Sequence, residues 1–351
     1  MTPCTVALFL PNWVGDVVMA TPAVRAVREH FPAATLVAVC KPYVADTLAG
    51  SPWFDATVLF DRSGPRHRRF WAVAGKLRQL RADTAVLFPN SFRAAALARV
   101  SGCGTVAGFA RYGRDFLLSH RLYPVRDRHG RPTVVPVVDD YNRIVARLGV
   151  PDPGHRLELH TTQADEAAAD GVWNRLGLRR YRTVVGLNPG GAFGAAKHWP
   201  HFADLAKRLA AKGAGVLVLG GPAEREISAG IIRDAAYPAV HSFDDTPLSL
   251  GLTKATIRRL GLLVTTDSGP RHFAAAFGVP VVTLYGPTHV GWTETRFAQS
   301  VHLQHRLPCG PCQQRDCPLG HHRCMTDLHP ADVAAAADHL LRTTAEVRRA
   351  G

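Results

Sequence analysis

Continuous apolar runs alternate with helical patterns along the first half of the chain. The run from Cys4 to Leu10 is almost entirely apolar and stops at Pro11, which is typical of a buried strand. A helix is predicted from Thr21 to His30, with Thr21 as its N-cap and the proline that follows as its first helical residue. Further strands are predicted at 35–40, 56–60 and 84–88, and a further helix at 70–81. Apolar strands separated by helices indicate a parallel sheet covered on both faces.

The second half repeats this plan without repeating the residues. Its strands are predicted at 183–187, 215–220, 262–266 and 279–286, and its helices at 202–212, 224–235 and 272–277. A loop-rich joint at 149–154 and a helix at 163–176 lie between the halves, and an Ala/Leu-rich helix follows Pro330. We therefore expect two doubly wound α/β domains, at 1–165 and 166–330, with a C-terminal helix at 331–351.

Composition narrows the class of protein. The 351 residues are 46% apolar and 20% charged, which suits two folded domains and excludes a largely disordered chain. No run reaches the roughly 18 apolar residues that span a bilayer. The apolar N-terminal stretch lacks the basic start of a signal peptide. We expect a soluble, cytoplasmic protein.

The chain carries an excess of positive charge. Its 42 Lys and Arg residues against 28 Asp and Glu residues give a net charge of +14, of which residues 1–160 hold +9. The stretch from Arg62 to Arg81 contains seven basic residues and no carboxylate. Such a field attracts phosphates, anionic lipids or nucleic acid, although a solvated basic face is an equally good interpretation.

Candidate functional residues follow the strands, because ligands of doubly wound sheets bind beyond the carboxyl ends of strands. Asp16 follows the first strand and a tight turn at Gly15. A carboxylate there serves either as a general base or as the N-cap of the next helix.

Four strands of the second half end in glycine turns. These turns lie at Gly190 and Gly191, at Gly220–Pro222, at Ser268 and Gly269, and at Gly286. The first continues to Lys197 but matches neither the P-loop nor the dinucleotide-binding pattern, and each turn alone is a weak signal. Their convergence on one sheet edge predicts that a nucleotide or diphosphate binds to the second domain.

Together these segments resemble the bacterial heptosyltransferases of glycosyltransferase family 9, close to the ADP-heptose:lipopolysaccharide heptosyltransferase II group. The resemblance is carried by residues 10–16, 89–93, 189–200, 267–272 and 285–287. It implies a GT-B fold, in which two doubly wound, Rossmann-like parallel-sheet domains face each other across a cleft. The N-terminal domain would bind the acceptor, and the C-terminal domain the nucleotide sugar.

The resemblance also implies roles for individual residues. Asp16 matches the proposed catalytic base of the family. Donor-binding positions are implied at Lys197, Asp267, Ser268, Gly269, His272, Gly190 and Gly191. Acceptor-side positions are implied at Asn90, Ser91 and Arg93. Pro270 and Arg271 depart from the apolar or small pair that is usual in the family.

The implied reaction is an inverting transfer of heptose from ADP-heptose to a lipopolysaccharide core acceptor. Asp16 would take the proton of the acceptor hydroxyl, while Lys197 and the N–H groups near Ser268 would stabilise the departing ADP. Neither a metal nor a cofactor is expected, and the chain has no Asp-x-Asp signature. The expected partners are ADP-heptose, an anionic glycolipid and, peripherally, the inner face of the cytoplasmic membrane, but no nucleic acid.

Other function classes remain alternatives. The positive charge suits a basic nucleic-acid-binding protein, but no recognition module is evident. The fold class also suits a dehydrogenase, but the G-x-G-x-x-G pattern is missing. A transferase of the same fold could use another nucleotide sugar or an acceptor other than lipopolysaccharide.

Four of the seven cysteines cluster near the C-terminus. Their spacing, Cys309-x2-Cys312-x4-Cys317-x6-Cys324, with His321 and His322 nearby, approaches that of zinc ligands. Free thiols, a structural zinc site and disulfides are the three interpretations, and a reducing cytoplasm disfavours the last.

Overall fold

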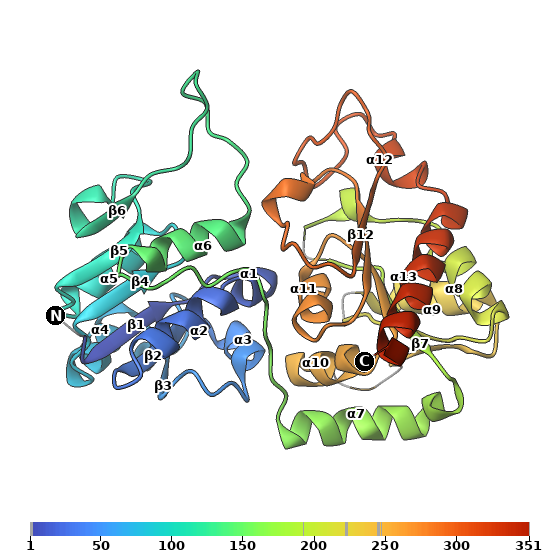
Figure 1. The fold of residues 1–351 in the computed structure, drawn as a ribbon, viewed down its shortest axis with the longest axis horizontal. Coiled ribbons are helices and arrows are strands. Elements are labelled where there is room, and N and C mark those ends of the chain that lie inside the picture. The colour runs from blue at the N-terminus through green and yellow to red at the C-terminus, as the bar shows by residue number, and fades with distance from the viewer. Residues whose placement is uncertain (1–2, 192, 222–223, 244–245, 247, 351) are drawn as a thin grey trace. The chain divides into compact units, whose positions relative to one another are not determined.

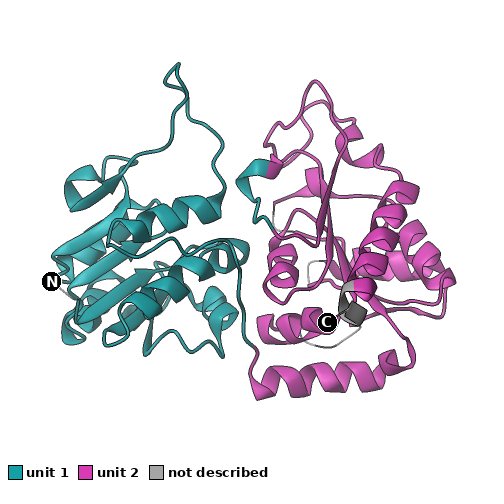
Figure 2. Ribbon diagram, viewed as in Figure 1, with its two compact units in different colours: residues 1–160, 291–296 teal, residues 161–290, 297–351 magenta. Residues whose placement is uncertain are grey.

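The computed structural model describes residues 3–191, 193–221, 224–243, 246 and 248–350. The chain forms two compact units, which Figure 2 distinguishes by colour: residues 1–160 with 291–296 are unit 1, and residues 161–290 with 297–351 are unit 2. Each unit contains one six-stranded sheet in which all paired strands are parallel. The assignment of one substrate to each unit remains a prediction.

Unit 1 has the strand order β3-β2-β1-β4-β5-β6 (Figure 1). Its strands are β1 (Thr5–Phe9), β2 (Thr35–Cys40), β3 (Ala56–Leu59), β4 (Thr84–Leu87), β5 (Thr105–Phe109) and β6 (His120–Leu122). Its helices are α1 (Val14–Met19), α2 (Thr21–His30), α3 (Pro42–Ala45), α4 (Phe70–Gln79), α5 (Phe92–Val100) and α6 (Val137–Ala146), with 3₁₀ turns η1 (Asp46–Leu48), η2 (Arg66–Arg68) and η3 (Asp115–Leu117).

The sheet of unit 1 is buried on both faces. Ala7 and Phe9 of β1 join an apolar cluster with Leu77 of α4 and Leu97 of α5. Val6 and Leu8 point to the opposite face, because side chains alternate along a strand, and both are fully buried. A strand between two covered faces has to be apolar throughout, which is the pattern from which β1 was predicted.

Unit 2 has the strand order β12-β11-β10-β7-β8-β9. Its strands are β7 (Val184–Asn188), β8 (Gly215–Val218), β9 (Val240–Ser242), β10 (Leu262–Thr266), β11 (Val281–Tyr285) and β12 (Ser300–Gln304). Its helices are α7 (Gln163–Arg175), α8 (Phe202–Ala211), α9 (Arg225–Ala235), α10 (Leu250–Arg258), α11 (Gly269–Ala276), α12 (Arg323–Thr326) and α13 (Pro330–Ala350), with 3₁₀ turns η4 (Leu178–Arg180) and η5 (Ala195–Lys197). A further 3₁₀ turn, η7 (Val290–Trp292), begins at the last residue of a unit 2 segment and continues into the 291–296 segment of unit 1.

The core of unit 2 depends on its last helix. Val333 and Ala337 of α13 belong to the same apolar cluster as Val185 of β7 and Trp199. The Trp199 indole is fully buried, and its N–H donates to the carbonyl oxygen of Leu328 at 2.9 Å. The hydrogen bond satisfies the one polar atom of this side chain and fixes the segment that leads into α13.

Every strand and helix predicted from the sequence is present, with ends displaced by at most three residues. The predicted cap of α2 is wrong. Its N-cap is Ala20, which also ends α1, and the Thr21 hydroxyl instead donates to the carbonyl oxygen of Val18 at 2.7 Å. The predicted turn at Gly220–Pro222 ends outside the described residues. Within those residues no helix is long and apolar enough to cross a membrane.

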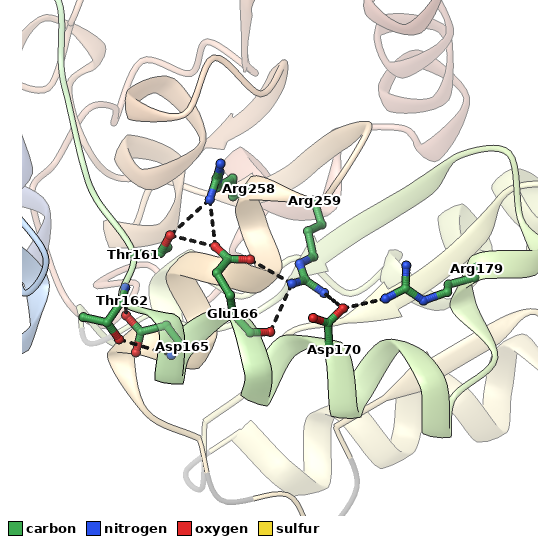
Figure 3. A network of polar contacts seen from close by, with 8 residues as sticks. All are labelled: Thr161, Thr162, Asp165, Glu166, Asp170, Arg179, Arg258 and Arg259. Atoms are coloured by element: carbon green, nitrogen blue, oxygen red, sulfur yellow. Dashed lines mark hydrogen bonds and ion pairs between the residues drawn. The ribbon is translucent and has the colours of Figure 1, made fainter.

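The start of α7 is held by a network of charged side chains (Figure 3). Thr162 and Asp165 form a reciprocal capping box at its N-terminus. Glu166 accepts hydrogen bonds from Arg258 at 2.8 Å and from Arg259 at 2.7 Å, both contributed by the end of α10. Burial alone would raise the pKa of Glu166, but these hydrogen bonds and one from the Thr161 hydroxyl lower it.

We expect Glu166→Gln to reduce the free energy of unfolding by about 1 kcal/mol at pH 7, because the network is only partly buried. A carboxyl group with a lowered folded-state pKa stabilises the fold above its unfolded pKa of about 4.3. That contribution is lost as the pH falls through the folded pKa. Chemical denaturation at pH 7 and below pH 4 measures this effect. The difference in the free energy of unfolding between wild type and variant should be present at pH 7 and disappear in acid. Glu226→Gln, at an exposed position, is the control. A difference between wild type and Glu166→Gln that persists in acid would contradict the link between the lowered pKa of Glu166 and stability.

Candidate active site

The loops after β7 and β10 meet at the carboxyl edge of the unit 2 sheet. These strands are parallel neighbours, so the chain leaves both on the same side. Asn188, the last residue of β7, places its side-chain amide between the two loops. The amide nitrogen lies 3.0 Å from the carbonyl oxygen of Gly190, and 3.0 Å from the hydroxyls of Thr265 and Ser268. One side chain therefore holds both loops together.

Two glycines allow three loops to approach closely at this edge. A Cβ atom at Gly190 would lie 2.3 Å from Cγ of Glu224, and one at Gly191 would lie 3.2 Å from Cβ of Ser268. The Glu224 carboxylate in turn accepts a hydrogen bond from the backbone N–H of Gly221, in the turn after β8, at 2.9 Å. A larger residue at Gly190 would displace the Glu224 side chain that accepts this hydrogen bond.

A buried ion cluster lies beside these loops; we call Lys197, Asp267, Arg271 and Thr288 the lysine–aspartate cluster. The Lys197 ammonium donates to the Asp267 carboxylate at 2.8 Å and to its carbonyl oxygen at 2.5 Å. The Thr288 hydroxyl donates to the same carboxylate at 2.7 Å, and Arg271 lies 3.6 Å from its other oxygen.

The carboxylate of this cluster is ionised. Burial alone would raise the pKa of Asp267, but Lys197 and Arg271 outweigh it and hold that pKa below its ordinary value. Two cations therefore face the Asp267 carboxylate. All three side chains are more than nine-tenths buried. Fixed positive charges at the strand ends favour an anion there.

The loop before Lys197 fixes the position of its ammonium. Gly194 has a φ of 134°, and a Cβ there would lie 2.7 Å from the carbonyl oxygen of Arg315. The next turn is tied to the same oxygen, which accepts a hydrogen bond from the N–H of Ala196 at 2.9 Å. The Lys197 ammonium also lies 4.5 Å from the centre of the Phe193 ring.

The start of α11 completes this edge. Ser268 is the N-cap of α11, but its hydroxyl contacts Asn188 instead of capping the helix. His272 is buried, and among the described residues its Nδ1 has no hydrogen-bond partner. Burial and then Arg271 lower the pKa of His272 far below its ordinary value, so the imidazole is neutral at pH 7.

The structure thus brings the predicted donor-side residues to one edge of one sheet. These are Gly190, Gly191, Lys197, Asp267, Ser268, Gly269 and His272. Their role in donor binding remains a prediction.

Asp16 lies at the corresponding edge of unit 1. It belongs to the first turn of α1, whose N-cap is Trp13, so the alternative that Asp16 is the N-cap is wrong. Burial and then the charges of Asp16 and Asp140 raise the pKa of Tyr141, which places the Asp16 carboxylate near this phenol. A carboxylate in this position has the chemistry of a general base, and that role remains a prediction.

The acceptor-side residues follow β4 in a loop that is built around a buried arginine. Arg114 is fully buried and donates to the side chain of Asn90 at 3.0 Å and to the carbonyl oxygens of Pro89 and Ser91 at 2.7 and 3.0 Å. Burial, with a smaller effect of a neighbouring arginine, lowers its pKa to about 10, so Arg114 stays charged at pH 7. Arg93, in contrast, is exposed. Arg114 therefore sets the shape of the loop that bears the predicted acceptor-side residues.

The clustered cysteines lie together in unit 2. Cys309, Cys312, Cys317 and Cys324 line one small cavity of about 30 Å³ with His321. All seven cysteines are unpaired, so the structure contains no disulfide. Among the described residues, no group of three or more His, Cys, Asp or Glu side chains is arranged to hold a metal ion. The choice between free thiols and a structural zinc site stays a prediction.

Sequence reasoning missed the residues that organise these loops. Asn188 is absent from the predicted site, although an amide at the end of a buried strand is a usable signal. Arg114 follows β5, a strand that was not predicted, and nothing in its local pattern distinguishes it from an exposed arginine. The sequence gives no signal for Thr288, whose role depends on its hydrogen bond to the Asp267 carboxylate.

Two six-stranded parallel sheets in tandem, each with polar residues at its carboxyl edge, are the architecture of the GT-B fold class. The model of Glycosyltransferase family 9 (heptosyltransferase) matches residues 70–323. The chain belongs to this family, and the expected fold class and enzyme class are confirmed.

Known proteins resemble the chain over nearly its whole length. It is 26% identical to lipooligosaccharide heptosyltransferase 2 of Campylobacter jejuni, over 96% of this chain and 98% of that protein. It is 27% identical to lipopolysaccharide heptosyltransferase 2 of Escherichia coli, over 94% and 97%. The solved structure of E. coli ADP-heptose lipopolysaccharide heptosyltransferase II superposes with a TM-score of 0.78, at 24% identity, and covers 97% of this chain and 99% of that one. The last comparison supports the fold.

Proposed function

We propose that the protein transfers heptose from ADP-heptose to a lipopolysaccharide core acceptor on the cytoplasmic side of the inner membrane. The observation that carries the proposal is the lysine–aspartate cluster in a member of the heptosyltransferase family. The names of its relatives, which include ADP-heptose and lipopolysaccharide, support this choice of substrates.

The donor diphosphate would bind at the edge where Lys197 and the N-terminus of α11 lie. The backbone N–H groups of a helix N-terminus and a fixed positive charge both favour phosphate oxygens. On binding, the Lys197 ammonium would exchange part of its interaction with Asp267 for a phosphate oxygen, while Arg271 continues to balance the carboxylate. The fixed cations would then stabilise the negative charge that develops on departing ADP, so the proposed reaction uses no metal.

The acceptor hydroxyl would attack the anomeric carbon of heptose in a single displacement. The bond from the acceptor oxygen to the anomeric carbon forms as the bond from that carbon to the phosphate oxygen breaks. The proton of the hydroxyl passes to Asp16, and ADP leaves with the electron pair. A single displacement inverts the configuration of the anomeric carbon.

A donor screen tests the proposal. We expect calorimetry to give the tightest binding for ADP-heptose, weaker binding for ADP and other ADP-sugars, and at least about tenfold weaker binding for UDP-sugars. Ligand at 100 times its Kd should raise the free energy of unfolding by about 2.7 kcal/mol. Preference for a UDP-sugar would contradict the proposal that ADP-heptose is the donor. Binding of DNA without binding of any nucleotide sugar would support the nucleic-acid-binding alternative.

A further inference from the structure

Unit 1 exposes large aromatic side chains around one hollow. The hollow has a volume of about 670 Å³. The residues that line it include Arg62, Arg69, Phe70, Trp71, Phe92 and Arg93, which we call the aromatic–arginine surface. Trp71 is 73% exposed and Phe92 is 48% exposed. Phe116, which is 69% exposed, extends the surface, since its ring centre lies 6.1 Å from that of Phe92.

These side chains come from separate elements of the fold. Trp71 lies in the first turn of α4, Phe92 and Arg93 begin α5, and Phe116 belongs to η3. Helix α5 packs against α4 (Figure 1) and also against η3. All three elements follow strands of one parallel sheet, so the aromatic–arginine surface forms at its carboxyl edge, where the acceptor-side loop also lies. Single exposed aromatic residues are common, but a group of them at one place indicates a binding surface.

The positive charge of this surface is not balanced. Within the part of the chain that the structure describes, Arg62, Arg69 and Arg93 have no carboxylate partner. Arg93 instead lies over the Phe70 ring, 6.0 Å from its centre. The guanidinium groups are therefore available to phosphate groups of a partner.

Exposed aromatic rings and arginines without a carboxylate partner together suit the interface of an anionic bilayer. Trp and Phe rings partition into the headgroup region, and arginines pair with lipid phosphates. Single-stranded nucleic acid also stacks on aromatic rings. The bilayer is favoured because the acceptor-side residue Arg93 borders the hollow and the proposed acceptor is lipid-linked, so this step rests on the proposed function.

We propose that the aromatic–arginine surface docks unit 1 on a membrane that contains anionic phospholipid. Docking at this edge presents the acceptor-side loop to the headgroups, where the sugar of a lipid-linked acceptor emerges. The lipid tails remain in the bilayer, so the enzyme needs to bind only the sugar and the membrane surface.

Vesicle binding tests the docking surface with the full chain. Wild type should bind vesicles of phosphatidylcholine with phosphatidylglycerol and bind pure phosphatidylcholine at least about tenfold more weakly. Each arginine near an anionic surface contributes about fivefold, so R62E/R69E should weaken binding on the order of 25-fold or more. Trp71→Ser should weaken it about tenfold, while Trp71→Phe should restore it to within about threefold of wild type.

The matched control is K76E/R78E, which makes the same change of charge near the other end of α4. Lys76 and Arg78 lie about 8 Å and about 10 Å along the helix from Trp71, close to one Debye length. Equal losses in K76E/R78E and R62E/R69E would overturn the docking surface, because net charge alone would explain them. Tighter binding of wild type to a single-stranded oligonucleotide than to anionic vesicles would overturn the lipid partner.

Measurement of ADP binding distinguishes a failure of the docking surface from a failure of the proposed function. R62E/R69E and Trp71→Ser should bind ADP as wild type does, which also shows that they are folded. If wild type binds ADP but not anionic vesicles, the docking surface is wrong and the proposed donor stands. If wild type binds the vesicles but no nucleotide sugar, the proposed function is wrong and the membrane surface stands.

Discussion

Replacement of Asp16 by alanine should abolish heptose transfer and leave ADP binding unchanged. The reason is chemical, because the acceptor hydroxyl must lose a proton as it attacks, and Asp16 is the carboxylate that we assign to receive it. Removing a general base lowers kcat by about 10²- to 10⁴-fold. Steady-state kinetics with ADP-heptose measure the loss, and calorimetry with ADP measures donor binding.

Two variants separate this role from a general effect of charge. Asp16→Asn keeps the size of the side chain but cannot accept the proton, so it should be as inactive as the alanine variant. Asp115→Ala removes an exposed carboxylate from η3, which follows β5 of the same sheet, and should retain full transfer. Near-normal turnover of Asp16→Ala would remove the assignment of Asp16 as the base.

Lys197→Met should weaken ADP binding by about 10- to 100-fold and also destabilise unit 2. Breaking a buried ion pair costs about 3–5 kcal/mol, and Arg271 reduces that cost here because it stays near the Asp267 carboxylate. Calorimetry gives the first effect and chemical denaturation the second. The two effects have to be separated, since a poorly folded protein also binds donor weakly.

The double variant K197M/D267N tests whether Lys197 serves only to neutralise Asp267. It also takes the Asp267 carboxylate away from the buried Arg271, so its stability should stay below that of Lys197→Met. ADP affinity should stay low, because the phosphate has lost its cation. Recovered affinity in the double variant would show that Lys197 serves only to neutralise Asp267.

Lys254 provides a matched control in the same unit. Its side chain is fully buried, and its ammonium lies 3.9 Å from the Asp165 carboxylate at the start of α7. Lys254→Met should also destabilise the protein but leave ADP affinity unchanged. A similar loss of affinity in both lysine variants would assign the effect of Lys197→Met to stability.

The strands could be predicted where burial on both faces imposes one pattern. Leu262–Thr266 is buried at every position, and its sequence shows only apolar or β-branched residues. Val184–Asn188 is equally buried, and only Gly186 and Asn188 interrupt the same pattern. Ser300–Gln304 escaped prediction because this edge strand is only partly buried and contains His302 and Gln304. Thr105–Phe109 was missed although it is buried, because its central residues include Ala107 and Gly108.

The sequence predicts where the candidate site lies, but not how its residues contact one another. The rule for strand ends directs attention to Lys197 and Asp267, but not to their ion pair, which joins residues 70 positions apart. Such a pair depends on how the loops pack, and no local pattern encodes it. The same holds for Arg114, whose role depends on carbonyl groups more than 20 residues earlier in the chain.

The place of α13 in the core has a consequence for the order of events during synthesis. Val333 and Ala337 complete a cluster that begins with Val185 of β7. On the ribosome, most of unit 1 is available for folding while unit 2 is still being made, since domains form in order from the N-terminus. Unit 2, however, keeps apolar surface uncovered until α13 emerges. A ribosome that stalls before Pro330 would therefore hold a nascent chain that chaperones recognise.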